Sequence, residues 1–272
     1  MSVEDLLIPL CRRSREQNME QCRICGAEST YFDEALMLKK YRAQYFRCQN
    51  CGFIQTEKPY WLDEAYSDAI VDSDIGLIER NIMLSRLTAA VISFCFPTAT
   101  SFLDYAGGYG ILVRLMRDRG FHFEWFDRYC ENMFAKSFRK SKDRYDVLTA
   151  FELFEHLPTP VEEVNVLSKI SDNILFTTTI VPRTIPKVDD WWYYAPYNGQ
   201  HVSFYTVESL QLLAKSFDYH YVGYRDIHLF SKQPVSQWKF SVAVRLSSWI
   251  NRFTSRKSLL GEDYRALTGS DI

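Results

Sequence analysis

Two pairs of cysteines with the same spacing stand near the start of the chain. Cys22 and Cys25 enclose two residues and precede a glycine, and Cys48 and Cys51 repeat this pattern 22 residues later. Thiolates two residues apart can bind Zn²⁺ from one tight turn, and four of them complete its tetrahedral shell at about 2.3 Å. Because four ligands leave no open position, the spacing predicts a structural zinc ribbon. The alternatives are two chance pairs or a redox dithiol, which is expected beside a βαβ unit that this segment lacks.

A glycine-rich segment in the middle of the chain has the residue types that hold a nucleotide-like ligand. Its acidic and small members are Asp104, Ala106, Gly107, Gly108 and Gly110. Small residues let the backbone approach a ligand closely, and a helix that begins there leaves N–H groups free for it. Asp127 stands at the expected end of the next strand, where a carboxylate can accept hydrogen bonds from both ribose hydroxyls. The alternatives are a dinucleotide phosphate turn, for which G-x-G-x-x-G is expected, and a tight turn without a ligand.

A third segment combines aromatic, acidic and histidine residues directly after an apolar run. Phe151 and Glu152 follow the run at 145–150, and Glu155 and His156 come next. The carboxyl end of a parallel strand borders the ligand crevice of an α/β sheet. We therefore expect Phe151 to pack against the ligand, and Glu152 is a candidate catalytic residue.

Residues 181–205 form a long segment rich in proline, tryptophan and tyrosine, and loops of this length are usually functional. His201 follows the aromatic residues and precedes Thr206, which can cap a helix. In an aromatic, partly dry pocket a histidine stays neutral near pH 7 and can remove a proton from a substrate hydroxyl. Alternatively, His201 only holds the loop in place. The aromatic side chains suit stacking on a sugar or aromatic substrate, or they cover the core: Trp191, Trp192, Tyr193 and Tyr194.

Strands that alternate with helices are expected to position these residues. Apolar residues between Ile75 and Phe94 recur at steps of three and four, which predicts a helix that ends before Pro97. The later apolar runs predict strands at 101–105, 121–126, 145–150 and 173–179, helices at 111–119, 131–140, 161–170 and 206–217, and a hairpin at 219–224 and 227–230. Such alternation indicates an α/β fold with a mainly parallel sheet that is covered on both faces.

The 272 residues are expected to divide into three parts. They are an N-terminal arm with the zinc ribbon at 1–59, the α/β domain at 60–231 and a helical tail at 232–272. Apolar residues make up 47% of the chain and charged residues 24%, which is typical of a globular protein. The net charge of −2 gives no field that favours nucleic acid. No apolar run is long enough to span a membrane, and the first residues do not have the order of a signal peptide, so a cytoplasmic protein is expected.

The order of these motifs resembles the class I S-adenosylmethionine-dependent methyltransferases over residues 75–230. The first motif of that family, D-x-G-x-G-x-G, matches at Asp104, Gly108 and Gly110, with Ala106 in place of the first glycine. Asp127 matches the ribose-binding acid, and the segment 145–158 is similar to the strand motif that ends in E-H-L-P. The resemblance implies a Rossmann-like fold, S-adenosylmethionine as the cofactor, and a structural role for Glu155 and His156. Only 18 residues separate Asp127 from Asp146, so we expect the sheet to be shortened at the edge where a third strand belongs.

The expected function is methyl transfer to a small molecule. A zinc ribbon before a methyltransferase domain also resembles the C-methyltransferases of nucleotide-linked deoxysugars, which carry a further C-terminal domain. A saccharide or polysaccharide precursor, such as a nucleotide sugar, is therefore the expected acceptor. An oxygen acceptor needs a base such as His201, whereas a carbon acceptor can use Tyr194 or Glu152.

Two alternatives belong to other classes of protein. One is a nucleic-acid or protein methyltransferase that docks through the zinc ribbon. For nucleic acid the chain lacks the N/D-P-P-Y/F motif, and segment 20–58 holds six basic and five acidic residues, which is too balanced to track phosphates. The other alternative is a non-catalytic module that only binds the cofactor. The intact cofactor residues argue against loss of binding, so we expect an enzyme.

Overall fold

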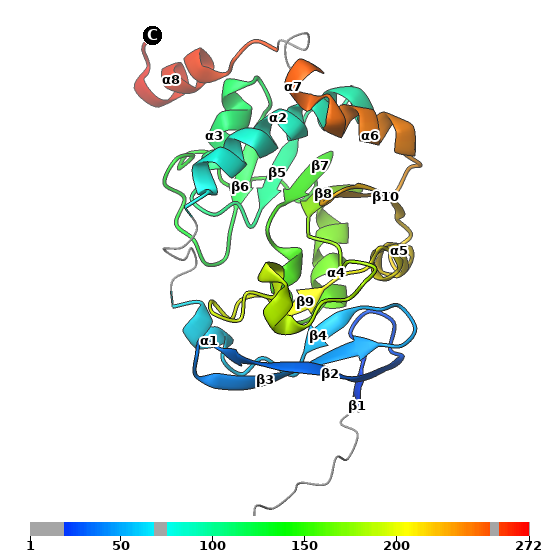
Figure 1. Cartoon of the computed structure of the whole chain (residues 1–272). Coiled ribbons are helices and arrows are strands. Elements are labelled where there is room, and N and C mark those ends of the chain that lie inside the picture. Colours follow the sequence, from blue (N-terminus) through cyan, green and yellow to red (C-terminus); the bar gives the residue numbers. More distant parts are fainter. Residues whose placement is uncertain (1–18, 68–74, 251–255, 272) are drawn as a thin grey trace, which may run out of the picture.

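The computed structural model describes residues 19–67, 75–250 and 256–271, so the expected N-terminal arm lies almost wholly outside the described residues. These residues form two sheets. A five-stranded sheet lies at one end of the molecule and helix α8 (Leu260–Thr268) at the other, with a six-stranded sheet between them (Figure 1). Among the described residues, no helix combines the length and apolar character that crossing a bilayer requires.

The five-stranded sheet carries the cysteine pairs and is antiparallel throughout. Its strands, in the order of the sheet, are β1 (Met19–Gln21), β2 (Glu28–Met37), β3 (Tyr41–Cys48), β4 (Ile54–Thr56) and β9 (Ser203–Phe204). The last strand comes from the aromatic loop, where Phe204 pairs with Ile54 and Ser203 with Gln55. The zinc-ribbon region and the aromatic loop therefore share one sheet.

The six-stranded sheet has the order β10-β11-β8-β7-β5-β6. Its strands are β5 (Phe102–Tyr105), β6 (Phe123–Phe126), β7 (Val147–Ala150), β8 (Asn173–Thr177), β10 (His220–Tyr224) and β11 (Ile227–Ser231). Strands β5 to β8 are parallel, and β10 and β11 form an antiparallel hairpin that joins β8. The expected Rossmann-like sheet with its closing hairpin is confirmed.

Helices cover both faces of this sheet because its parallel strands are buried and mainly apolar at consecutive positions, which face opposite sides. Phe102 packs in a core with α2 (Leu77–Cys95), α3 (Ile111–Asp118) and α6 (Gln237–Arg245). Leu103 faces the opposite core, with α4 (Pro160–Ile170) and α5 (Val207–Lys215). The remaining short helices are α1 (Leu62–Ala65), α7 (Ser247–Ile250), η1 (Phe154–His156), η2 (Val188–Asp190) and η3 (Trp192–Tyr194). The cysteines pack at the edge of the second core, so the zinc-ribbon region rests on the α4–α5 side.

Helix α8 is attached to α3 by a buried ion pair. Arg117 donates from Nε to Asp263 at 2.9 Å, and both side chains are almost fully buried. The same guanidinium lies over the ring of Phe138, 3.6 Å from its centroid. This contact connects the C-terminal helix to the segment that follows β6.

The helix expected at 131–140 is wrong, because this segment is extended. The Asn132 side chain closes a turn by bonding both the N–H and the C=O of Ala135. The N–H groups of residues 133 and 134 donate to the carbonyl of Tyr109, which ties this turn to the glycine-rich segment. Beyond the turn, Trp125 exchanges two backbone hydrogen bonds with residues 138 and 140. A single bridge between Trp125 and Arg139 replaces a third strand in the described sheet, and the expected shortened edge is confirmed.

Candidate active site

A cavity of about 910 Å³ opens at the carboxyl ends of the parallel strands. Its wall includes the glycine-rich turn after β5, Asp127 after β6, and Phe151 and Glu152 after β7. The aromatic loop closes another side with Trp192 and His201. The volume lies near the top of the range of about 300–1,000 Å³ that small-molecule sites occupy. The glycine-rich turn with Asp127 and the aromatic loop, which were both singled out from the sequence, thus face one cavity.

The glycine-rich turn has a backbone that only small residues tolerate. Gly110 has a φ of 84° and immediately precedes α3. Gly107 has no room for a side chain, since a Cβ would lie 2.8 Å from Asp104 Oδ2. Ala106, at the position of the family's first glycine, has a φ of 59°, in the left-handed region that disfavours residues with a Cβ. The turn therefore keeps the glycine conformation although one glycine is replaced.

Asp104 is a buried carboxyl at the base of this turn. Its side chain accepts a hydrogen bond of 2.7 Å from the Thr149 hydroxyl. Burial raises the pKa of Asp104 to about 7, although the Thr149 hydrogen bond acts in the opposite direction. Near pH 7 this carboxyl can therefore both donate and accept a hydrogen bond at the cavity wall.

Asp127 holds the other side of the turn through three backbone N–H groups. Oδ1 accepts from Tyr129 at 2.7 Å and from Cys130 at 2.8 Å, and Oδ2 accepts from Gly108 at 2.9 Å. A carboxylate oxygen has two lone pairs. Oδ1 is thus saturated, and Oδ2 keeps one lone pair for a ligand in the cavity.

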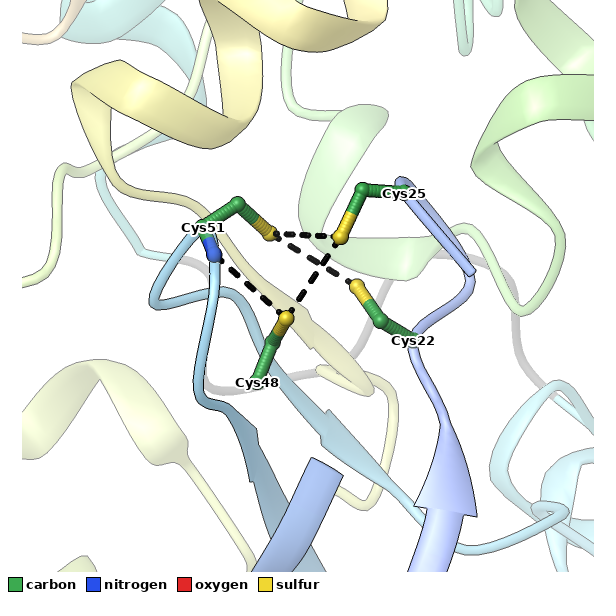
Figure 2. A group of neighbouring side chains, drawn as sticks. All are labelled: Cys22, Cys25, Cys48 and Cys51. Carbon is green, nitrogen blue, oxygen red and sulfur yellow. Dashed lines mark hydrogen bonds between the residues drawn. The ribbon is translucent and has the colours of Figure 1, made fainter. Parts of the chain in front are cut away.

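The four cysteines point toward one another from two turns (Figure 2). The Sγ atoms of Cys22 and Cys51 are 3.6 Å apart, those of Cys25 and Cys48 3.5 Å, and those of Cys25 and Cys51 3.6 Å. A tetrahedron with Zn–S bonds of about 2.3 Å has sulfur atoms about 3.8 Å apart. A disulfide would need about 2.05 Å. The spacing therefore fits a four-thiolate metal site and excludes disulfides.

Backbone N–H groups surround these sulfur atoms, as is usual for metal-binding thiolates. Ile24 donates to Cys22 Sγ, and Asn50 and Cys51 donate to Cys48 Sγ, each at 3.4 Å. A hydrogen bond from the Cys51 thiol lowers the pKa of Cys22 to about 5, while the pKa of Cys51 is raised. The four sulfur atoms could hold a metal ion as thiolates, and such a donor set favours Zn²⁺.

One ring nitrogen of His201, Nδ1, is held by a hydrogen bond, and the other, Nε2, takes no part in that bond. Nδ1 lies 2.6 Å from the carbonyl of Tyr193 and must donate to it, so Nε2 carries the lone pair of the neutral ring. Burial lowers the pKa of His201 to about 4, and the hydrogen bond to Tyr193 only partly opposes this. His201 is therefore neutral at physiological pH, and its Nε2 can accept a proton.

Glu155 and His156 lie next to His201, with donor atoms within 4.8 Å of one another. Three such groups can hold a metal ion, but His156 is engaged elsewhere. Its Nδ1 lies 3.0 Å from the Tyr66 hydroxyl, and the ring also bonds the backbone of Gln200. Burial raises the pKa of Glu155 far above its usual value, and burial together with His201 lowers that of His156. His156 thus has hydrogen-bond partners, whereas Glu155 Oε2 is buried without one, so the cluster is a candidate for acid–base chemistry as well as for a metal ion.

The remaining candidate residues divide between the cavity and the core. Glu152 lines the cavity and accepts a hydrogen bond of 2.8 Å from Thr177. Tyr194 does not reach the cavity, because it is fully buried and packs edge-on against Tyr45. The geometry gives Tyr194 a packing role and leaves it without access to an acceptor.

The aromatic residues of the loop divide between the cavity and the core. Trp192 and Tyr193 line the cavity, whereas Trp191 and Tyr194 pack in the core beneath the loop. No pattern in the sequence pointed to Tyr66, which lies 90 residues from its partner His156. No local spacing can reveal a contact of that range.

The comparisons with known proteins agree with this arrangement. A family model of a methyltransferase domain matches residues 80–223, which is more than half of the chain. The chain belongs to this methyltransferase family. Together with the Rossmann-like sheet, this makes it a class I S-adenosylmethionine-dependent methyltransferase. A search of curated proteins by sequence finds no match.

Several solved methyltransferase structures are similar to this methyltransferase at low identity. An O-methyltransferase family 2 protein from Planctomyces limnophilus in complex with apigenin is 16% identical, with a TM-score of 0.43 over 63% of this chain and 65% of that chain. Magnesium protoporphyrin IX methyltransferase from Synechocystis with bound SAM is 12% identical, with a TM-score of 0.37 over 64% of this chain and 90% of that chain. CalO1, a methyltransferase in calicheamicin biosynthesis, is 13% identical, with a TM-score of 0.42 over 62% of this chain and 60% of that chain. This chain covers less than two thirds of the length of the first and of the third of these proteins.

Proposed function

We propose that this methyltransferase transfers a methyl group from S-adenosylmethionine to a hydroxyl of a saccharide or saccharide precursor. The observation that carries the proposal is the shared cavity. One end holds the glycine-rich turn and Asp127, and the other holds the free Nε2 of His201 beside aromatic side chains. A methyl donor and an acceptor hydroxyl can thus meet within one enclosed volume.

The cofactor half of the cavity is assigned to the turn after β5. When bound, S-adenosylmethionine supplies an electrophilic methyl group on a sulfonium. The remaining lone pair of Asp127 Oδ2 accepts from a ribose hydroxyl, and Phe151 packs against the cofactor. Asp104, Ala106, Gly107, Gly108 and Gly110 bring the backbone close to it. The absence of space for a Cβ at Gly107 supports this use of the turn.

The acceptor half is assigned to His201. His201 Nε2 would take the proton of an acceptor hydroxyl as the methyl group of the cofactor is transferred to that oxygen. The carbonyl of Tyr193 stabilises the resulting imidazolium through Nδ1. Glu152 faces the same cavity, and we assign it to holding a second acceptor hydroxyl. Positioning the two reactants contributes much of the rate in such a reaction.

Exposed aromatic rings at the cavity favour a saccharide. Trp192 is 75% exposed, Tyr129 72% and Tyr197 58%, and all three line the cavity. Exposed faces of this kind stack on sugar rings. We further propose that Cys22, Cys25, Cys48 and Cys51 hold one structural Zn²⁺, since their sulfur spacing matches a tetrahedral site.

The test uses radiolabelled S-adenosylmethionine with a panel of nucleotide sugars and glycosides. We expect transfer to at least one saccharide, with His201→Gln lowering turnover by about 10²–10⁴ while affinity for S-adenosylhomocysteine stays within twofold. Because the pKa of His201 is about 4, the wild-type rate should not fall between pH 7 and pH 5 through this group. His122→Gln, which changes an exposed histidine away from the cavity, serves as the matched control.

Three outcomes contradict the proposal. Full turnover of His201→Gln would show that His201 is not the base. Transfer only to a protein or a nucleic acid would show that the acceptor is not a saccharide. Failure of the wild-type protein to bind either S-adenosylmethionine or its demethylated product would falsify the cofactor site.

A further inference from the structure

The residues on both sides of His201 are held by the N-terminal region. Trp61 donates from Nε1 to the carbonyl of Gly199 at 2.8 Å. The Gln200 side chain donates to the carbonyl of Ala65 at 2.8 Å, and the N–H of residue 56 donates to the carbonyl of residue 202 at 3.1 Å. Residues 199, 200 and 202, on both sides of the histidine, thus each bond the segment 56–65.

This segment leads directly back to the cysteine site. Strand β4 begins three residues after Cys51 and pairs with β9, two residues after His201. The Thr206 hydroxyl donates to the carbonyl of Cys51 at 2.6 Å. A Cβ on Gly52 would come within 3.0 Å of the Thr206 methyl group. The loop that carries His201 is therefore fastened to the cysteine turn at its C-terminal end as well.

The cofactor turn has different supports. Gly107 donates to the carbonyl of Phe126, Gly108 to Asp127, and the carbonyl of Gly108 accepts from Trp125 Nε1. All of these partners belong to β6 or directly follow it. Among the described hydrogen bonds, none joins the turn to the segment 19–67. The two halves of the cavity are thus anchored to separate parts of the fold.

We infer that the segment 56–65 of the N-terminal region is a positioning device for His201, and that Trp61 is its main positioning residue. This inference rests on the proposed function, because it assigns the acceptor base to His201. It gives the zinc-ribbon region a role in the acceptor half of the site and none in cofactor binding.

Trp61 suits this role because its bond is buried and cannot be replaced by water. The side chain is 1% exposed, and its ring packs within 3.2 Å of the position of a Cβ on Gly199. Gly199 itself has a φ of 66°, so the loop conformation depends on this residue. Removal of the indole donor leaves the Gly199 carbonyl buried without a partner, which favours opening of the loop.

Opening of the loop has a measurable effect on His201. The ring is kept neutral by burial, and the titratable groups that face it are His156, Glu155 and Tyr193. Burial is the largest cause of the lowered pKa of His201, and the hydrogen bond to Tyr193 acts in the opposite direction. Contact with water should therefore raise the pKa of His201 toward the ordinary value of about 6.5.

The test compares Trp61→Phe with Tyr60→Phe in the full-length protein. Each variant loses one hydrogen-bond donor of an aromatic side chain, but the Tyr60 hydroxyl bonds Arg42 within the zinc-ribbon region. In Trp61→Phe we expect amide hydrogen exchange at residues 199–205 to rise at least tenfold and the NMR titration of His201 to shift upward. Exchange at 104–112 and the Kd for S-adenosylhomocysteine should stay within twofold. Tyr60→Phe should leave all four measurements unchanged.

Unchanged exchange at 199–205 together with an unchanged His201 titration overturns the inference. It is also overturned when Trp61→Phe weakens cofactor binding as strongly as it loosens the loop. If Trp61→Phe does not fold, Gln200→Met, which removes the donor to Ala65, is read by the same criteria. A wild-type protein that does not bind S-adenosylhomocysteine contradicts the proposed function, while the exchange and titration results remain readable.

Discussion

Replacing Asp127 by asparagine should weaken cofactor binding. The carboxylate already accepts three backbone hydrogen bonds, so one lone pair on Oδ2 is left for a ribose hydroxyl. A hydrogen bond to a charged group contributes about 1.5–3 kcal/mol. Since about 1.4 kcal/mol corresponds to a tenfold change, Asp127→Asn should raise the Kd for S-adenosylhomocysteine by about 10- to 150-fold.

Calorimetric titration at pH 7 measures this change, and Asp146→Asn provides a matched control. Asp146 also accepts backbone hydrogen bonds, from Thr100 at 2.8 Å and Ser101 at 2.9 Å. It lies at the opposite end of the sheet, outside the cavity, before β7 begins. The control should therefore destabilise a similar turn without changing cofactor affinity.

The reasoning fails in two recognisable ways. An unchanged Kd in Asp127→Asn shows that no ribose hydroxyl bonds this carboxylate. An equal loss of affinity in Asp146→Asn shows that general destabilisation, and not a lost ligand bond, explains the effect.

Three further predictions concern the metal, the turn and the C-terminal helix. Cys48→Ser should reduce zinc from about one ion per chain to almost none in metal analysis, and full zinc content in the variant contradicts the four-thiolate site. Ala106→Gly should raise the free energy of unfolding by about 0.5–1 kcal/mol in urea titration, since it relieves a positive φ, and a loss of stability contradicts this. Asp263→Asn should cost about 3 kcal/mol because it leaves Arg117 buried without its charge partner, whereas Asp271→Asn, in an exposed pair, should cost less than about 1 kcal/mol. Equal effects of these two substitutions on the melting temperature would refute the buried pair.

The fold was predictable from the sequence where local pattern and tertiary packing agree. The apolar run before Asp104 became β5, and the two runs around Arg225 became the closing hairpin. The prediction of a helix at 131–140 is wrong because polar contacts of this segment outweigh its helical pattern. The C=O of Phe138 and the N–H of Lys140 pair with the backbone of Trp125 in β6, so they are not available to a helix. Nothing in the local sequence reveals that competition.

The candidate site was predictable where its residues are close together in the chain. The cysteine pairs and the glycine-rich turn are local motifs, and the structure brings each of them together. The support of His201 was not predictable, because Trp61 and Gly199 are 138 residues apart. A strand of two residues such as β9 also has no detectable alternation. Tyr194 was misjudged since its neighbours in the chain face the cavity while its own ring faces Tyr45.

The ion pair between α3 and α8 has a consequence for the nascent chain on the ribosome. Arg117 and Asp263 are 146 residues apart, and translation proceeds at about 5–20 residues per second. For about 7–30 s, therefore, Arg117 has been synthesised while Asp263 has not. During this interval the side of α3 that Asp263 later covers stays open, and a chaperone has its opportunity to bind there. A chain that stops before Asp263 keeps this exposed charge and apolar surface permanently, so such products should be degraded or aggregate instead of accumulating as folded protein.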